Sequence, residues 1–89
     1  MKKRLRIFIE GKVQGVSFMY FAREEARRLG LTGFAKNLPD GSVAIEAQGE
    51  EGLLQKLTAL CRQGPPSAKV ERSDIGEISL VDGEEGFVI

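Results

Sequence analysis

The residues with the clearest potential for chemistry lie in the segment GKVQGVSFMY, residues 11–20. Gly11 and Gly15 bracket a short turn between an apolar strand pattern and a helical pattern. Backbone N–H groups in such a turn, at the start of a helix, often surround a bound phosphate. An anion site of this kind usually adds a fixed positive side chain, yet Met19 occupies the position where the loop becomes helix. The segment therefore predicts a phosphate cradle without the expected charge.

The composition limits the chemistry that is available to this cradle. The sequence has no histidine and a single cysteine, Cys61, which excludes a His/Cys zinc site and His-based acid–base or triad catalysis. We expect neither a metal nor a cofactor. A lone thiol forms no intramolecular disulfide, which fits a cytoplasmic location. Cys61 falls on the apolar stripe of a predicted helix, so we interpret it as a buried packing residue rather than a nucleophile.

The length of the chain limits the number of domains, and its net charge limits the kinds of partner. The chain has 89 residues, too few for two cores, so we expect one domain over residues 1–89. Its 13 basic and 13 acidic residues cancel, which leaves no global field to attract nucleic acid or an anionic membrane surface. No apolar run reaches the roughly 18–20 residues of a membrane span. We expect a monomer with no nucleic acid and no membrane as partner.

Hydrophobic periodicity predicts the elements that flank the cradle. Leu5, Ile7 and Ile9 recur at every second position, which indicates a strand with one half-buried face that ends at Gly11. From Ser17 to Leu29 the apolar residues take helical spacing, and Gly30 is placed as the C-terminal cap. The cradle is therefore expected to join the end of a strand to the start of a helix.

A hairpin and a second helix complete the pattern. LTGFAKN and SVAIEAQ read as strands, and LPDG between them has the residues of a tight turn. Residues 53–61 have the spacing of an amphipathic helix. Residues 68–80 read as a strand that extends or bends, and residues 87–89 could add a short last strand. The order βαββαβ favours an α+β, ferredoxin-like sandwich, with an antiparallel sheet, two helices on one face and a short optional fifth strand.

Two motifs in this order make the chain resemble the acylphosphatase family. That family carries a G-x-V-Q-G-V-x-F-R loop and a G-x-N-x-x-D-G-x-V-like hairpin on this fold, and the present sequence reads GKVQGVSFM and GLTGFAKNLPDGSV. The resemblance covers nearly the whole chain. It implies hydrolysis of the carboxyl–phosphate bond of acyl phosphates to a carboxylate and inorganic phosphate. The expected partners are thus a small acyl phosphate, or inorganic phosphate or sulfate.

The resemblance also implies roles for individual residues. In the family, the loop amides and the arginine hold the phosphate, and the hairpin asparagine orients the attacking water. Here the water-positioning residue is Asn37, and Met19 takes the position of the arginine. The phosphate-binding residues that correspond to the loop are Gly11, Lys12, Val13, Gln14, Gly15, Val16, Ser17 and Phe18.

Met19 decides how much activity the resemblance predicts. A carboxylate, with a pKa of roughly 4 for its acid, leaves as an anion without a general acid, so the reaction needs no histidine. It does need stabilisation of charge on the phosphoryl oxygens. A guanidinium supplies permanent charge and a planar fork of donors, whereas a thioether is only a weak acceptor. We therefore expect weak or absent hydrolysis. If another cation compensates, Arg23, one helical turn further on, is the first candidate and Lys12 the second.

Simpler interpretations stay open for several of these residues. Gly11 and Gly15 also suit a tight connection with no ligand. Gln14 acts through its backbone N–H, or its side chain is solvated. Asn37 also suits a strand end that bonds the following turn. Packing is the favoured role of the apolar cradle residues, which are Val13, Val16 and Phe18.

Two other functions compete with hydrolysis. The alternative is a non-catalytic phosphate-, anion- or partner-binding module on the same fold. An RNA-recognition module has the same element order, but its stacking aromatics would be limited to Phe8 and Phe34 in a chain of zero net charge. The sequence therefore favours phosphate chemistry over nucleic-acid binding.

Overall fold

The fold is described from a computed structural model that covers residues 1–15 and 17–89. Val16, one of the predicted cradle residues, lies outside the described residues. The elements are β1 (Lys2–Lys12), α1 (Phe18–Arg28), β2 (Thr32–Asn37), β3 (Val43–Glu50), α2 (Glu51–Gln63), β4 (Lys69–Ile78) and β5 (Phe87–Val88). The predicted βαββαβ order and the short last strand are confirmed.

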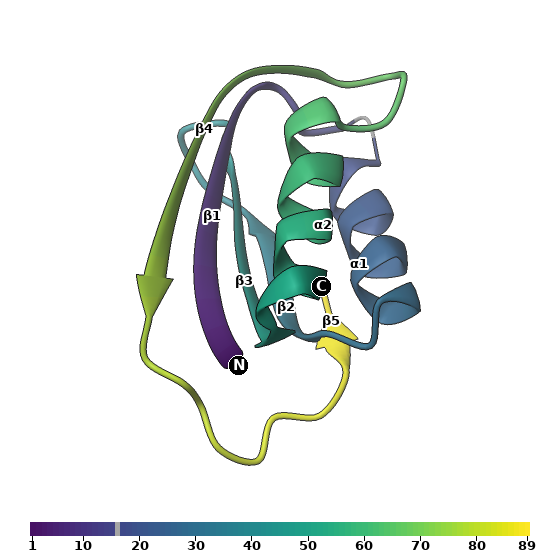
Figure 1. Cartoon of the computed structure of the whole chain (residues 1–89). Coiled ribbons are helices and arrows are strands. Elements are labelled where there is room, and N and C mark those ends of the chain that lie inside the picture. Colours follow the sequence, from purple (N-terminus) through teal and green to yellow (C-terminus); the bar gives the residue numbers. More distant parts are fainter. Residues whose placement is uncertain (16) are drawn as a thin grey trace.

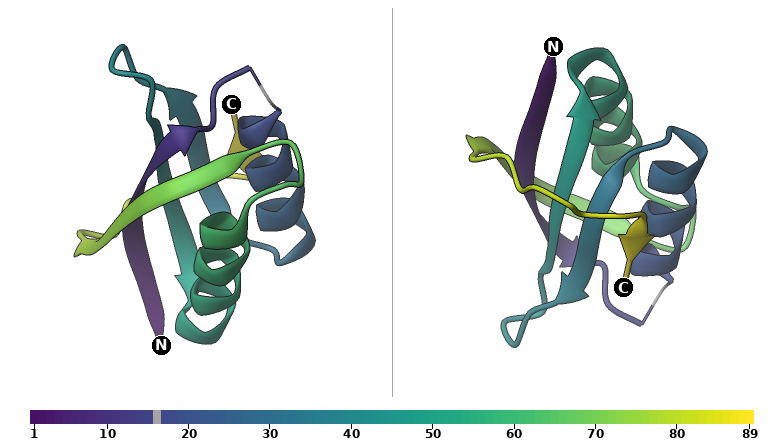
Figure 2. Two further views of the ribbon diagram at one scale, coloured as in Figure 1. Left: turned by 90° about the horizontal axis from the view of Figure 1, so that it is seen from above. Right: turned by 90° about the horizontal axis from the view of Figure 1, so that it is seen from below.

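The strands form one sheet in the order β4-β1-β3-β2-β5, and both helices cover the same face of it (Figures 1 and 2). The predicted ferredoxin-like α+β class is therefore confirmed. The prediction of an antiparallel sheet was wrong in one respect. β1, β2, β3 and β4 pair antiparallel, but β5 pairs parallel with β2, so the sheet is mixed. The chain that leaves β4 crosses to the opposite edge of the sheet and enters β5 in the direction of β2 (Figure 2).

Strand β1 is longer than its sequence pattern indicates. We expected it to end at Gly11, but it continues to Lys12 because β4 pairs with both residues beyond a register shift at Glu10/Gly11. Gly11 has φ +127°, a conformation that favours glycine. A Cβ there would overlap the carbonyl oxygen of Lys69 and lie 2.9 Å from the backbone nitrogen of Glu71. The glycine thus allows β1 to continue where it was expected to stop.

The core lies between the sheet and the helices. Alternate residues of β1 and β3 and the apolar stripes of both helices meet there, and Cys61 of α2 is fully buried among them. Burial raises the pKa of the Cys61 thiol to about 12, so the prediction of a packing residue is confirmed. The largest side chains of the core are Phe18, Phe87, Ile7, Ile9, Ile45, Leu54 and Leu57.

Residues 79–86, the connecting segment between β4 and β5, are held by polar contacts to the sheet. Arg4 is 2% exposed; its guanidinium donates to Glu84 at 2.8 Å and to Glu46 at 3.0 Å. The side-chain amide of Gln48 donates to the carbonyl of Val81 and accepts from its N–H, both at 2.9 Å. These bonds fix the path that carries the chain into β5.

No helix among residues 1–15 and 17–89 has the length and apolar character that crossing a membrane requires.

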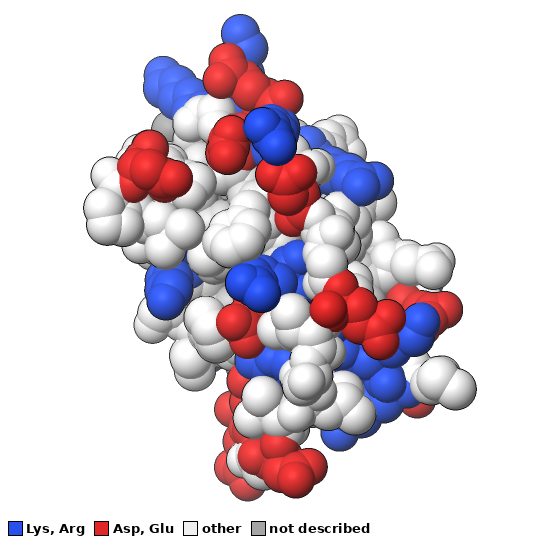
Figure 3. All heavy atoms as spheres, turned by 90° about the vertical axis from the view of Figure 1, so that its left-hand side faces the viewer, with Lys and Arg blue, Asp and Glu red and all other residues white. Residues whose placement is uncertain are grey.

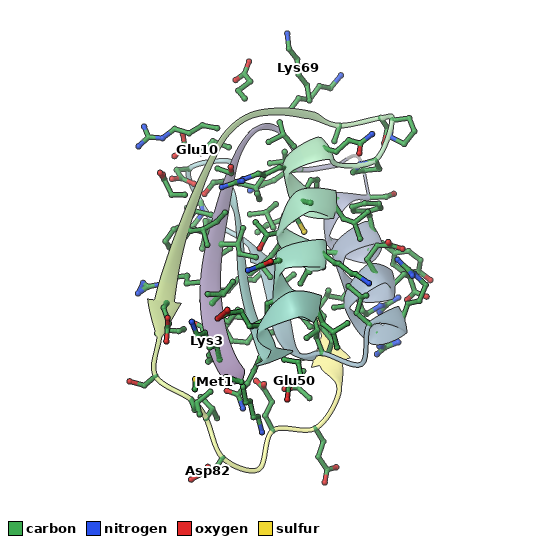
Figure 4. All side chains as sticks on the ribbon, in the orientation of Figure 1. Met1, Lys3, Glu10, Glu50, Lys69 and Asp82 are labelled. Atoms are coloured by element: carbon green, nitrogen blue, oxygen red, sulfur yellow. The ribbon has the colours of Figure 1, made fainter. Side chains whose placement is uncertain are left out.

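Ion pairs occur where β1 begins: the Met1 amino group lies 2.8 Å from Glu50, and Lys3 pairs with Glu51. Figure 4 shows Met1, Lys3 and Glu50 at this end of the sheet, with Glu10 and Lys69 at the opposite end. The cradle lies beyond β1, toward the Glu10 end.

Candidate functional site

A cavity of about 240 Å³ lies at the start of α1 and beside the end of β2. It contains Met19 and Asn37, which are 18 positions apart in the sequence but were assigned to one site. The residues that line it are Val13, Gly15, Ser17, Phe18, Met19, Tyr20, Asn37 and Ile89. Much of the predicted cradle and the predicted water-positioning residue therefore border a single cavity.

The backbone of the cradle is turned sharply at two lining residues. Gly15 has φ +73°, and Ser17 has φ +62° and ψ +24°, which is left-handed for a residue other than glycine. A left-handed residue followed by a helical one, as at Ser17 and Phe18, directs successive amides into a shared concavity that suits an anion. For a residue other than glycine, as at Ser17, this backbone conformation is costly, and such strained residues concentrate at functional sites.

The N-terminus of α1 is open to a ligand. Ser17 is the N-cap residue, but its side chain makes no capping hydrogen bond, and the first turn contains no acidic residue. The helical ladder begins where the N–H of Phe21 donates to the carbonyl of Ser17 at 2.9 Å. Amides before that point have no partner within the helix and carry the positive end of its dipole. The cavity therefore offers backbone donors and a favourable field to an anion.

Met19 is half-buried and packs against the core while it lines the cavity. Its thioether has no proton to donate and no charge. Among the described residues that line the cavity, none is basic. The donors that these lining residues offer to phosphoryl oxygens are thus uncharged: backbone amides, the Asn37 side chain and the hydroxyls of Ser17 and Tyr20.

The two candidate compensating cations lie outside this lining. The guanidinium carbon of Arg23 is 4.3 Å from the ring centre of Tyr20, and its Nε donates to Glu24 at 3.3 Å. Lys12 is exposed as the last residue of β1. Neither lines the cavity, nor does Gly11, whose close approach to β4 gives it a structural role.

Gln14 links the cradle to the hairpin. The sequence suggested that Gln14 acts through its backbone N–H or that its side chain is solvated. In the structure its Nε2 donates to the carbonyls of Leu38 and Ser42, both at 2.8 Å. This turn directly follows Asn37. Ser42 also donates from Oγ and N to Asp40, and these hydrogen bonds, the Oγ one foremost, hold the pKa of the Asp40 carboxyl below its ordinary value. One side chain therefore connects the cradle to the turn next to the predicted water-positioning residue.

Sequence reasoning missed Tyr20 and Ile89, which also line the cavity. Tyr20 adjoins Met19 at the start of α1, and an exposed aromatic beside a predicted site was the signal available. Ile89 follows β5, where Phe87 pairs with Gly33 and its carbonyl accepts a 3.1 Å bond from Arg27 Nε. No local signal marks Ile89, because its position depends on the path of the connecting segment.

The chain is similar to known proteins along almost its whole length. The acylphosphatase family model matches residues 5–89. An acylphosphatase of Rubrobacter xylanophilus is 42% identical over 87 residues, which are 98% of this chain and 79% of that relative. An acylphosphatase of Shewanella amazonensis is 48% identical over 75 residues, 84% and 82% of the respective chains. The crystal structure of acylphosphatase from Bacillus subtilis has a TM-score of 0.93 and 38% identity, and the match covers 100% of this chain and 98% of that one.

Proposed function

Since the chain belongs to the acylphosphatase family, we propose that its cavity binds the phosphoryl group of an acyl phosphate and that its hydrolysis is weak or absent. The observation that carries this proposal is the lining of the cavity: the amides of the cradle and Asn37 are there, whereas the arginine position holds Met19. The site thus combines the positioning groups of a phosphohydrolase with a deficit of positive charge.

The chemistry follows from these groups. Amides around Gly15 and Ser17 hold the phosphoryl oxygens at the positive end of α1. Asn37 borders the same cavity and orients a water molecule for in-line attack on phosphorus. The P–O bond to the acyl group breaks, and the carboxylate leaves as an anion, because its conjugate acid is strong enough to need no protonation. Inorganic phosphate remains in the cradle and is then released.

Met19 leaves the developing charge on the phosphoryl oxygens without a guanidinium. In GTPases, the arginine that serves this purpose accelerates phosphoryl transfer by about 10³–10⁵, or roughly 4–7 kcal/mol of barrier. We use that range as an analogy for the deficit at Met19. A deficit of this order reduces turnover far more than it reduces phosphate binding, because amides also bind the ground state.

The test is hydrolysis of benzoyl phosphate by the protein, by Met19→Arg and by Met19→Leu. We expect Met19→Arg to gain roughly 10³-fold, by the same analogy, and Met19→Leu to stay as slow as the protein itself. Adding Asn37→Ala to Met19→Arg should remove the gain. Fast hydrolysis by the unsubstituted protein, equal to that of Met19→Arg, would refute the proposal. In that case Arg23→Gln and Lys12→Gln would identify the cation that serves the phosphate.

A non-catalytic anion-binding module is the second candidate, favoured by the absence of a basic residue among the described lining residues. It predicts phosphate or sulfate binding with no turnover, even in Met19→Arg. Thermal unfolding separates the possibilities: a midpoint that rises with inorganic phosphate but not with chloride shows an anion site. A midpoint that is independent of phosphate and sulfate would exclude both functions.

We further propose that the chain acts as a monomeric single domain in the cytoplasm, without a nucleic-acid partner. β4 is an edge strand, but it has a register shift and a run of charged side chains, features that oppose edge-to-edge pairing. On the face that includes β4, positive and negative side chains are interspersed (Figure 3). Such a surface offers no single-sign patch to a polyanion. Sedimentation at high protein concentration tests the monomer.

A further inference from the structure

The mouth of the cavity has an apolar side that the phosphoryl chemistry does not use. Tyr20 is 57% exposed and Ile89 is 51% exposed, yet both line the cavity. Met19 lies beside them, and the buried Val13 and Phe18 also contribute to the lining. The cavity therefore has amide donors and Asn37 that suit an anion, and it also has apolar surface, including the ring of Tyr20, that suits an apolar group. We call Met19, Tyr20 and Ile89 the apolar rim.

A side-chain contact orients Tyr20, and strand pairing fixes the two residues before Ile89. The Tyr20 ring is stacked under the guanidinium of Arg23 at 4.3 Å. Ile89 follows Phe87, which is fully buried, and Val88, which pairs with Phe34 of β2. Asn37 ends the same strand β2. Because β5 runs parallel to β2, the chain after Val88 continues toward the end of β2, where Asn37 lies.

Building on the proposed function, we propose that the apolar rim is a binding subsite for the acyl group and selects acyl phosphates with aromatic or branched aliphatic acyl groups. With the phosphoryl group on the cradle amides, the acyl group must extend from the cradle toward the mouth. There it meets apolar surface, whose burial favours binding. An acyl group with its own carboxylate finds no basic partner among the described lining residues.

Calorimetric titration with three stable probes tests the subsite without requiring turnover. Inorganic phosphate and methylphosphonate test the cradle, and benzylphosphonate adds a phenyl ring to the same anion. We expect benzylphosphonate to bind roughly tenfold more tightly than methylphosphonate, as partial burial of one ring implies. Equal affinities for the two phosphonates would overturn the subsite and leave the cradle intact. Failure of all three probes to bind would overturn the cradle and the subsite together.

Variants assign the effect to the rim. Tyr20→Gln and Ile89→Ser should each lower the preference for benzylphosphonate by roughly threefold or more, with unchanged affinity for inorganic phosphate. Val88→Ser is the matched control, because Val88 is 53% exposed and precedes Ile89 but does not line the cavity. It should keep the preference. A preference that survives both rim variants, or one that Val88→Ser lowers equally, would refute the assignment.

Discussion

Gln14 is the residue whose contacts best explain how the site keeps its geometry. Its side-chain amide bonds two carbonyls of the turn after Asn37. Both carbonyls also accept a backbone bond within the turn, from Gly41 to Leu38 and from Leu38 to Ser42. The turn would therefore form without Gln14, but its distance from the cradle would not be fixed. We infer that Gln14 positions Asn37 relative to the phosphate without touching substrate.

Replacing Gln14 with methionine keeps the length of the side chain and removes both donors. We expect the free energy of unfolding to fall by about 1–2 kcal/mol, which is two ordinary hydrogen bonds, since each carbonyl keeps one partner. In the Met19→Arg background, kcat should fall more than the affinity for phosphate. Urea unfolding and benzoyl phosphate kinetics measure the two effects. Gln55→Met, at an exposed position of α2, is the control and should change neither quantity.

At the scale of elements, the junction between β1 and β4 determines where the cradle begins. The strands stay paired through Lys12, and the register shift at Glu10/Gly11 gives the junction its extra residue, Glu71. A bulge of this kind bends a strand and changes the direction in which its chain leaves. The chain therefore leaves β1 after Lys12, one residue beyond the glycine that the junction requires, and the part of the cradle that lines the cavity begins at Val13.

Gly11→Ala should strongly destabilise this junction. The added methyl would collide with backbone atoms of Lys69 and Glu71, and φ +127° is strained for alanine. We expect the loss of unfolding free energy to reach about 1–3 kcal/mol or more. Gly52→Ala is the matched control: apart from its chain neighbours and the backbone of its own helix, no atom lies within 4 Å of the new methyl in α2, and helix propensity should raise the free energy of unfolding by roughly 0.5–1 kcal/mol. Similar effects of the two substitutions in urea unfolding would contradict this account of the junction.

At the scale of the whole molecule, Arg4 joins parts of the chain that are far apart in sequence. Its guanidinium bonds Glu46 and Gln48 of β3 and makes two bonds to Glu84 of the connecting segment. Arg4 is buried and its two carboxylate partners are partly buried. Since the connecting segment leads to β5 and Ile89, these bonds help to fix the position of Ile89 at the cavity. Hydrogen bonds from Arg4, and secondarily from Thr32, hold the pKa of the Glu84 carboxyl below its ordinary value of 4.5.

Arg4→Met should cost about 3 kcal/mol of unfolding free energy, because it leaves Glu84 without its cation while that side chain is only 18% exposed. The control is Arg28→Met. Arg28 pairs with Glu25 but is 62% exposed, so its loss should cost less than about 1 kcal/mol. Comparable losses of unfolding free energy from the two variants at neutral pH would show that burial does not determine how much the Arg4–Glu84 pair contributes to stability.

The same pair predicts acid sensitivity. Because the pKa of Glu84 is lowered in the folded state, its contribution is complete above the unfolded value of 4.5 and is lost as the pH falls through the folded pKa. The protein should therefore lose stability below pH 4.5, and Arg4→Met should lose less over the same interval. Urea unfolding from neutral pH downward measures both curves. Parallel curves would show that Glu84 does not titrate through its bond to Arg4.

Much of the fold and part of the candidate site followed from the sequence alone. Apolar periodicity predicted the four longer strands and both helices, and the LPDG turn predicted the hairpin that ends β2 beside Asn37. The cradle motif, the place of Met19 within it and the burial of Cys61 were likewise readable. These features depend on short-range preferences, namely side-chain alternation, helical spacing and turn residues, which a short window of sequence contains.

Tertiary structure decided the features that depend on the path of the chain. The continuation of β1 past Gly11 required β4 as a partner, and the parallel direction of β5 required the connecting segment to cross the sheet. The two carbonyl partners of Gln14 are 24 and 28 positions away, and Ile89 reaches the cavity only through β5. Each depends on contacts between residues remote in sequence, for which no local preference exists, so only the folded chain could assign them.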